Sequence, residues 1–201
     1  QHQNQLIDLA LDARDKDTGW ISGRGCDGME YSGLAAAAGL PGFKLELAEY
    51  DNSGRFGRRP LPDCWNKTDG DVGAKTTWSR DMSSGLFFYL WRTKDLTTIA
   101  RHIKFGTEKN WKMGEPTDDF RVFYTPQVIG EIYQIQYALG GANNGNRYWP
   151  AIYPESLTGY EVNLLLLSIA LRGEIAMVNS DPDNIPAPII PHIPEGITQI
   201  M

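Results

Sequence analysis

The sequence predicts a mainly α-helical domain, built from helical hairpins that are joined by long aromatic loops. Two observations carry this prediction. Apolar residues recur at helical spacing in most segments from residue 79 onward, and helix start and stop signals bracket those segments. In addition, no pair of alternating segments stands out as a strand pair. We expect one helical domain over residues 1–179, with an irregular region at 15–77, and a Pro-rich extended tail at 180–201.

The first third of the chain is predicted to be mostly loop. Residues 3–14 have the pattern of a short amphipathic helix. Residues 15–77 are rich in Gly and Asp, and they leave room for only one small Ala-rich helix near 30–39. A loop region this long is usually functional or covers another part of the protein.

Two helices are expected between residues 79 and 108. Ser79 is placed to cap the first, which runs to about Thr93 and is apolar on nearly all sides, so we expect it to be buried. Asp95 is placed to cap the second, which is apolar on one side only. Its apolar stripe is Leu96, Ile99 and Ile103, and its other faces carry Arg101, His102 and Lys104.

The later helices have clear boundaries. Thr125-Pro126 is a helix start, and Gly140-Gly141 is the matching stop. A capping box at residues 158–161 opens a Leu-rich helix to about Met177. Residues 121–124 are expected to form a short extended piece. Helices that are apolar all round alternate with helices that are apolar on one side only. This alternation is expected where helices pack in concentric layers.

Composition excludes several functional classes. The chain has 201 residues and a formal net charge of -6, without a Lys/Arg cluster, so nucleic-acid binding has no electrostatic basis. The longest apolar run, 164–171, is far shorter than the ~20 residues that cross a membrane. The six Trp and nine Tyr suit both sugar binding and core packing.

The two cysteines favour an oxidising compartment. Cys26 and Cys64 both lie in Gly/Asp/Pro-rich loops, and we predict a disulfide between them rather than free thiols. Closing so long a loop would stabilise the fold by about 4 kcal/mol in the chain-entropy model. The sequence starts at Gln1 without Met, as expected for a processed product. An extracellular or periplasmic location follows.

The most informative constellation lies at the start of the buried helix. Trp78, Arg80 and Asp81 place an aromatic ring, a guanidinium and a carboxylate together. Asp81 would also complement the helix dipole with no functional role, but Arg80 opposes the dipole and needs another partner. An Arg-Asp pair beside a flat ring suits vicinal sugar hydroxyls.

This Trp-Ser-Arg-Asp-Met segment resembles the Trp-x-Arg-Asp element of glucoamylase-type and related (α/α)-toroid glycoside hydrolases. The resemblance covers about ten residues and the helical layout. It implies that Arg80 and Asp81 hold hydroxyls of the sugar at the cleavage subsite, with Trp78 beside them. A complete toroid needs ten to twelve helices and this chain offers about six, so the sequence predicts only part of one.

A second constellation supplies candidate catalytic groups. Trp111 is followed by Glu115, Asp118 and Asp119. Glycoside hydrolysis usually needs one protonated and one ionised carboxyl group about 5–10 Å apart. Glu115 against the Trp111 ring would be the acid, and Asp118 or Asp119 the base. The alternative is a solvated acidic turn.

The early loops alternate Asp with Gly, as loops that present oxygens to calcium do. The segments are 15–19, 51–54 and 69–71. None carries the distal Glu of an EF-hand, so plain Asx-turns are the main expectation and no cofactor is predicted, with calcium as the alternative.

The function that these features favour is glycoside hydrolysis of an oligo- or polysaccharide, and a polysaccharide lyase is the neighbouring alternative. The competing hypothesis is a non-catalytic extracellular structural or attachment protein, such as a subunit of a surface filament or of a phage particle. In that case the tail at 180–201 would mediate self-association.

Overall fold

The structure is a computed structural model that describes residues 12–21, 27–60, 77–115, 122–141 and 170–171. As predicted, this part of the chain is mainly helical. Its helices are α2 (Gly28–Ala37), α3 (Arg80–Thr93), α4 (Leu96–Glu108) and α5 (Pro126–Ala138). The helices expected at 3–14 and 158–177 fall mostly outside the described residues, and the tail at 180–201 falls wholly outside them.

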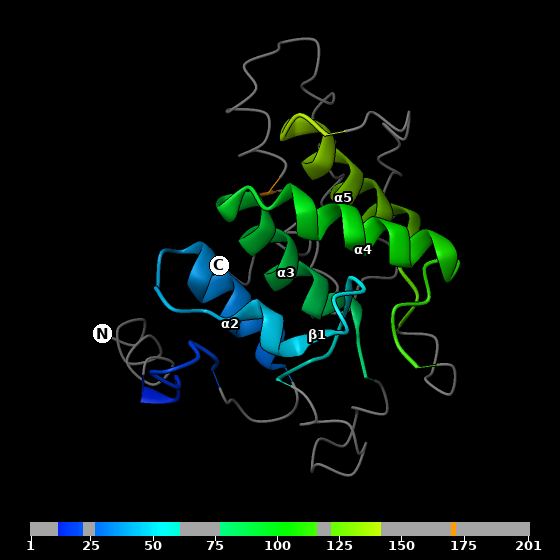
Figure 1. The fold of residues 1–201 in the computed structure, drawn as a ribbon. Helices are drawn as coiled ribbons and strands as arrows, with labels where there is room; N and C mark the ends of the chain where they lie inside the picture. Colours follow the sequence, from blue (N-terminus) through cyan, green and yellow to red (C-terminus); the bar gives the residue numbers. More distant parts are fainter. Residues whose placement is uncertain (1–11, 22–26, 61–76, 116–121, 142–169, 172–201) are drawn as a thin grey trace, which may run out of the picture.

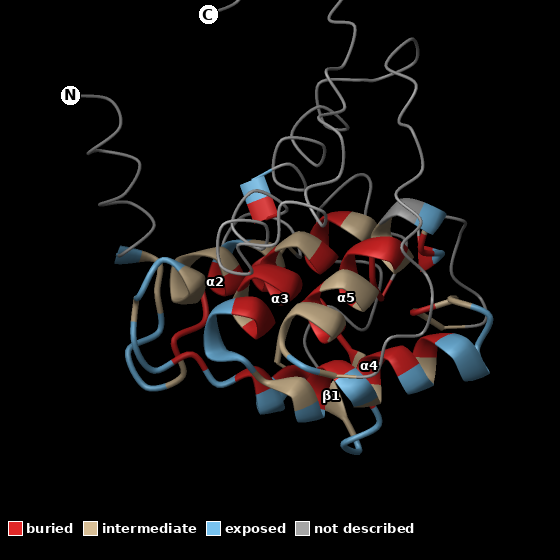
Figure 2. Cartoon of the chain, turned by 90° about the horizontal axis from the view of Figure 1, so that it is seen from above, coloured by how far each residue is buried: buried red, intermediate tan, exposed pale blue. Residues whose placement is uncertain are grey.

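Helix α3 is the centre of the described structure, and it contacts α2, α4 and α5 (Figures 1 and 2). Its sequence is apolar on nearly every side, so it is stable only where other elements surround it. Met82, Leu86 and Leu90 are fully buried. The predicted bounds are confirmed, because the helix begins after Ser79 and ends at Thr93, where Lys94 takes the left-handed conformation (φ 56°).

Helices α2 and α3 touch backbone to backbone through a pair of glycines. A Cβ atom on Gly33 would lie 2.9 Å from Cα of Gly85, and a Cβ on Gly85 would lie 2.7 Å from Cα of Glu30. Real Cβ atoms essentially never approach other atoms this closely. The crossing therefore requires glycine in both helices. The sequence carries Ser-Gly-Leu at each of the two places, 32–34 and 84–86.

The caps of α4 and α5 are as predicted. Asp95 accepts a hydrogen bond from the Thr98 amide (3.0 Å). Thr125 accepts one from the Val128 amide (3.5 Å), with Pro126 in the first turn. Each cap satisfies a backbone N–H that has no partner inside its helix.

The burial of His102 on helix α4 differs from the expectation from the sequence. The buried residues of this helix include the predicted Ile99 and Ile103, but His102 is buried as well, with 0% of its surface exposed. The sequence placed His102 on a polar face. The difference arises because a hairpin and Tyr124 cover this side of the helix and supply hydrogen bonds to the imidazole.

That hairpin lies in the region that the sequence predicted to be loop, so it was not expected. A 3-10 turn, η1 (Leu45–Ala48), leads into β1 (Glu49–Tyr50), which pairs antiparallel with β2 (Arg55–Phe56). Strands of two residues are too short for alternation to be visible in the sequence. Phe123, in the expected extended piece, pairs with Lys112 in an isolated bridge.

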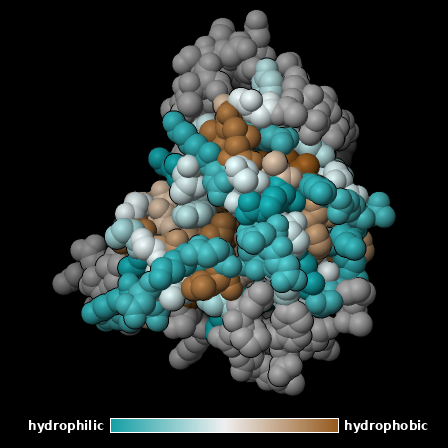
Figure 3. Space-filling view, in the orientation of Figure 1, coloured by the Kyte–Doolittle hydropathy of each residue, from teal (hydrophilic) through white to brown (hydrophobic). Residues whose placement is uncertain are grey.

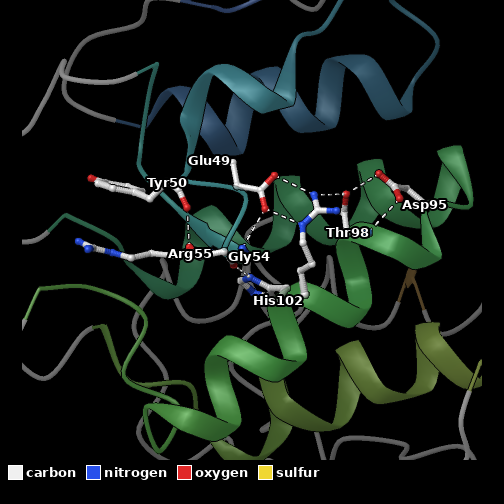
Figure 4. A network of polar contacts seen from close by, with 9 residues as sticks. Glu49, Tyr50, Gly54, Arg55, Asp95, Thr98 and His102 are labelled. Carbon is white, nitrogen blue, oxygen red and sulfur yellow. Dashed lines mark hydrogen bonds and ion pairs between the residues drawn. The ribbon is translucent and has the colours of Figure 1, made fainter.

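The hairpin is held on α4 by an ion pair between the buried Glu49 carboxylate and the partly exposed Arg101, shown in Figure 4. Both oxygens of Glu49 accept from Arg101, at 2.9 and 2.8 Å, and one also accepts from the Gly54 amide at 2.8 Å. The Glu49 side chain is only 4% exposed. Planar, bidentate geometry makes such a pair stronger than a single contact. The network continues through Thr98 to Asp95.

On the face shown in Figure 3, hydrophilic side chains cover most of the described surface, and apolar side chains appear between them in separate patches. Within the ranges that the structure describes, none of the helices is both long and apolar enough to cross a membrane.

Candidate functional site

The first turns of α2 and α3 each carry a carboxyl group, and the two groups interact electrostatically. Gly85 lies against the backbone of Glu30, and Asp81 is four residues before Gly85, on the same face of α3. Asp81 therefore lies one turn nearer the start of α3, and Glu30 is in the first turn of α2. We refer to Glu30, Asp81 and their charged neighbours Asp27 and Arg58 as the carboxylate site.

Glu30 has an unusual protonation equilibrium. Burial, together with the smaller effects of the negative charges of Asp81 and Asp27, raises the pKa of its carboxyl from 4.5 to about 7, and Arg58 opposes this rise. Burial disfavours the charged form of an acid, and a like charge nearby does the same. Near neutral pH, Glu30 is therefore poised between its protonated and ionised forms.

Asp81 is held in place by its own helix start. It is 8% exposed, and it accepts a short hydrogen bond from the Ser79 hydroxyl. Ser79 therefore contacts a side chain instead of capping the backbone of α3. Arg80 is half-buried, and its guanidinium forms no hydrogen bond or ion pair with any residue in the described ranges.

Asp27 and Arg58 complete the carboxylate site. Arg58 donates to Asp27 at 2.9 Å, and its backbone carbonyl accepts from the Met29 amide at 2.7 Å. Arg58 is buried. The ion pair fixes the N-terminal end of α2, where Asp27 precedes the first helical residue.

Trp78 belongs to the core and not to an open surface. It is 1% exposed, and its indole N–H donates to the Tyr124 hydroxyl at 3.2 Å. The predicted role as a flat platform for sugar therefore has no accessible ring face here. The sequence could not show this, because a Trp before a buried helix fits either environment.

Glu115 lies in an ion pair with Arg55 at 2.5 Å, and its backbone N–H donates to Thr77 at 3.1 Å. The Arg55 guanidinium also lies over the Tyr50 ring, 4.1 Å from its centre. Glu115 is thus tied to the hairpin. Asp118 and Asp119 lie outside the described residues, so the predicted grouping of these acids stays a prediction.

Trp111 is half-buried at the end of α4 and takes a positive φ of 60°. Its ring covers Gly106, where a Cβ would lie 2.5 Å from a ring carbon, and it stacks on Tyr124 at 6.3 Å between ring centres. It is therefore partly a core residue, and a half-buried ring still leaves surface for a ligand.

The remaining predictions concern metal and disulfide. In the part of the chain that is described, no group of three His, Cys, Asp or Glu side chains is arranged to hold a metal ion. Asp15 instead accepts from the amides of Asp17 and Thr18, as in an Asx-turn. The loop at 69–71 and both cysteines, Cys26 and Cys64, lie outside the described residues.

The functional residue that the sequence reasoning missed is Glu30. Asp27 and Glu30 have the spacing of a capping box, which marks a helix start. This signal would have placed Glu30 in the first turn of α2. It would not have shown that α3 buries the carboxyl.

Comparison with protein-family models gives no match. Comparisons with curated proteins and with solved structures give no match either. The function is therefore argued from the residues alone.

Proposed function

We propose that this protein is a carbohydrate-active enzyme of the glycoside hydrolase type, with Glu30 and Asp81 as its paired carboxyl groups. One observation carries the proposal. Helices α2 and α3 touch backbone to backbone, and their carboxyl groups are near enough for the charge of Asp81 to raise the pKa of Glu30. Glycoside hydrolases use such a pair, one member protonated and the other ionised.

The roles follow from the surroundings of each group. Glu30 is the general acid, since its pKa of about 7 keeps a proton available at neutral pH. Asp81, as the second carboxyl group of the pair, stabilises positive charge on the sugar ring or activates water. This assignment replaces the sequence-based choice of Glu115, because Glu115 is paired with Arg55. Asp118 and Asp119 remain alternatives for the base.

The resemblance to (α/α)-toroid enzymes points to the same part of the chain but to another role for Asp81. It implies that Arg80 and Asp81 hold sugar hydroxyls, whereas the proposal gives Asp81 a part in the chemistry. Arg80 keeps the binding role, and its guanidinium has no partner among the described residues. Donors of this kind bind vicinal hydroxyls in fixed geometry. We propose in addition that the substrate is an oligo- or polysaccharide and that the protein is exported.

A screen of glycans for binding and hydrolysis tests the proposal. Glu30→Gln should abolish turnover and keep binding, whereas Asp81→Asn should weaken both. Glu108→Gln is the matched control, because Glu108 is an exposed carboxylate on α4, 3.9 Å from Lys104. We expect kcat/KM to fall above pH about 7, as Glu30 loses its proton. Equal turnover in Glu30→Gln and wild type would contradict the assignment.

The structural-protein alternative also has a specific observation in its favour. Asp81, Glu115 and Trp78 all contact groups of their own chain. If no glycan binds and the 180–201 deletion disperses an oligomer, this alternative is the better account. A product with a new carbon–carbon double bond would instead identify a polysaccharide lyase.

A further inference from the structure

A chain of buried hydrogen bonds runs from the hairpin to the start of α3. Nδ1 of His102 is 2.7 Å from the Gly54 carbonyl oxygen, and Nε2 is 3.0 Å from the Tyr124 hydroxyl. The same hydroxyl is 3.2 Å from Nε1 of Trp78. His102, Tyr124 and Trp78 are all buried.

Donors and acceptors allow only one arrangement of protons. The Gly54 carbonyl can only accept, so Nδ1 of His102 carries the proton and donates it there. In a neutral imidazole Nε2 is then unprotonated and accepts from the Tyr124 hydroxyl, whose oxygen in turn accepts from the indole N–H of Trp78. Burial lowers the pKa of His102 from 6.5 to about 4, in accord with a neutral ring.

The hairpin end of this chain is fixed. Glu49 accepts from the Gly54 amide and from Arg101, as Figure 4 shows. Gly54 also lies directly on α4, since a Cβ there would be 2.5 Å from the His102 amide nitrogen. Its carbonyl is therefore a rigid anchor for the imidazole.

The other end of the chain reaches the carboxylate site. Trp78 comes three residues before Asp81, and the intervening Ser79 contacts the Asp81 carboxylate. We propose that Tyr124 is a positioning residue, which fixes the start of α3, and with it Asp81, by holding the Trp78 indole. This inference deepens the proposed function, because it concerns the pair that the function requires.

The titration of Glu30 provides a test that needs no substrate. Its carboxyl is faced by Asp81 from α3, by Asp27 and by Arg58. Tyr124→Phe removes one oxygen and leaves the ring. If Asp81 moves away or water enters, both effects lower the Glu30 pKa. We expect its midpoint, followed by NMR of labelled Glu carboxyl carbons and assigned with Glu30→Gln, to fall by about half a unit or more.

Tyr133→Phe is the matched control. Tyr133 lies on α5 with its ring against Trp111 and is not a member of this chain of hydrogen bonds, so removal of its hydroxyl should leave the Glu30 midpoint unchanged. A folded Tyr124→Phe protein with the wild-type midpoint would overturn the inference.

If Tyr124→Phe does not fold, Trp78→Phe removes the donor of the same bond, and an unchanged midpoint there overturns the inference equally. The proposed function is tested separately, because wild-type turnover in Glu30→Gln would contradict it. That result would not change the titration of Glu30 in the Tyr124 variant.

Discussion

The stability of this protein should depend on pH through two groups with opposite effects, the buried His102 and the half-buried Glu30. His102 has a pKa of about 4 when folded and 6.5 as a free side chain. The unfolded chain binds more protons between these values, so stability is complete above pH 6.5 and is lost on acidification towards pH 4. The difference between the two pKa values, at about 1.4 kcal/mol for each unit, amounts to about 3 kcal/mol.

Glu30 acts in the other direction. Its pKa is about 7 when folded and 4.5 as a free side chain, so the folded chain binds more protons between these values. Its stabilising contribution is complete below pH 4.5 and is lost as pH rises through 7. Because Glu30 is only half-buried, we reduce its contribution to about 2 kcal/mol. The two groups largely cancel in the wild-type protein.

Glu30→Gln should remove this cancellation. Its free energy of unfolding should fall by about 2–3 kcal/mol between pH 7.5 and 4.5, since His102 is then unopposed. The wild-type protein should lose less than half of that. Urea unfolding, followed by far-UV circular dichroism at several pH values, measures both profiles. Parallel profiles for the two proteins would refute the reasoning on Glu30, and a flat profile for Glu30→Gln would refute that on His102.

Three further predictions concern the scaffold. Gly85→Ala should destabilise the protein by about 1–3 kcal/mol in urea unfolding, because its Cβ would force α2 and α3 apart. Arg101→Ala should cost about 3–5 kcal/mol and expose the hairpin amides to hydrogen exchange, because it leaves the buried Glu49 charge without its partner. Non-reducing mass spectrometry should find the peptides of Cys26 and Cys64 linked, and two freely alkylated thiols would disprove the disulfide.

Matched controls exist for the first two. Ser84→Ala changes the residue next to Gly85 and should stay within about 0.5 kcal/mol of wild type. Lys104→Ala removes an exposed cation from the helix that carries Arg101, and it should leave hairpin exchange unchanged. Equal effects in a variant and its control would contradict the mechanism given for that variant.

Local chemistry made much of the fold predictable from sequence. Asp95 and Thr125 cap helices because a short polar side chain satisfies nearby amides, and that choice depends on a few neighbouring residues. The α2–α3 contact was not predictable in the same way. Gly33 and Gly85 look like weak points in two helices until each is paired with the other.

The candidate site was predictable only in part. Asp81 stood out because it lies with Arg80 at a helix start. Glu30 did not stand out, because its pKa depends partly on Asp81, which lies on α3, some fifty residues later in the chain. His102 was placed on the wrong face for a similar reason, since the groups that bury it come from the hairpin and from Tyr124.

The glycine contact between α2 and α3 also affects how the protein tolerates sequence change. Two backbones that touch directly have no side-chain rotamers between them to rearrange, so a new side chain at either glycine can be accommodated only by moving a helix. The separation of α2 and α3 at this crossing is set by main-chain contact. Gly33 and Gly85 should therefore accept fewer substitutions than the exposed positions of the same helices.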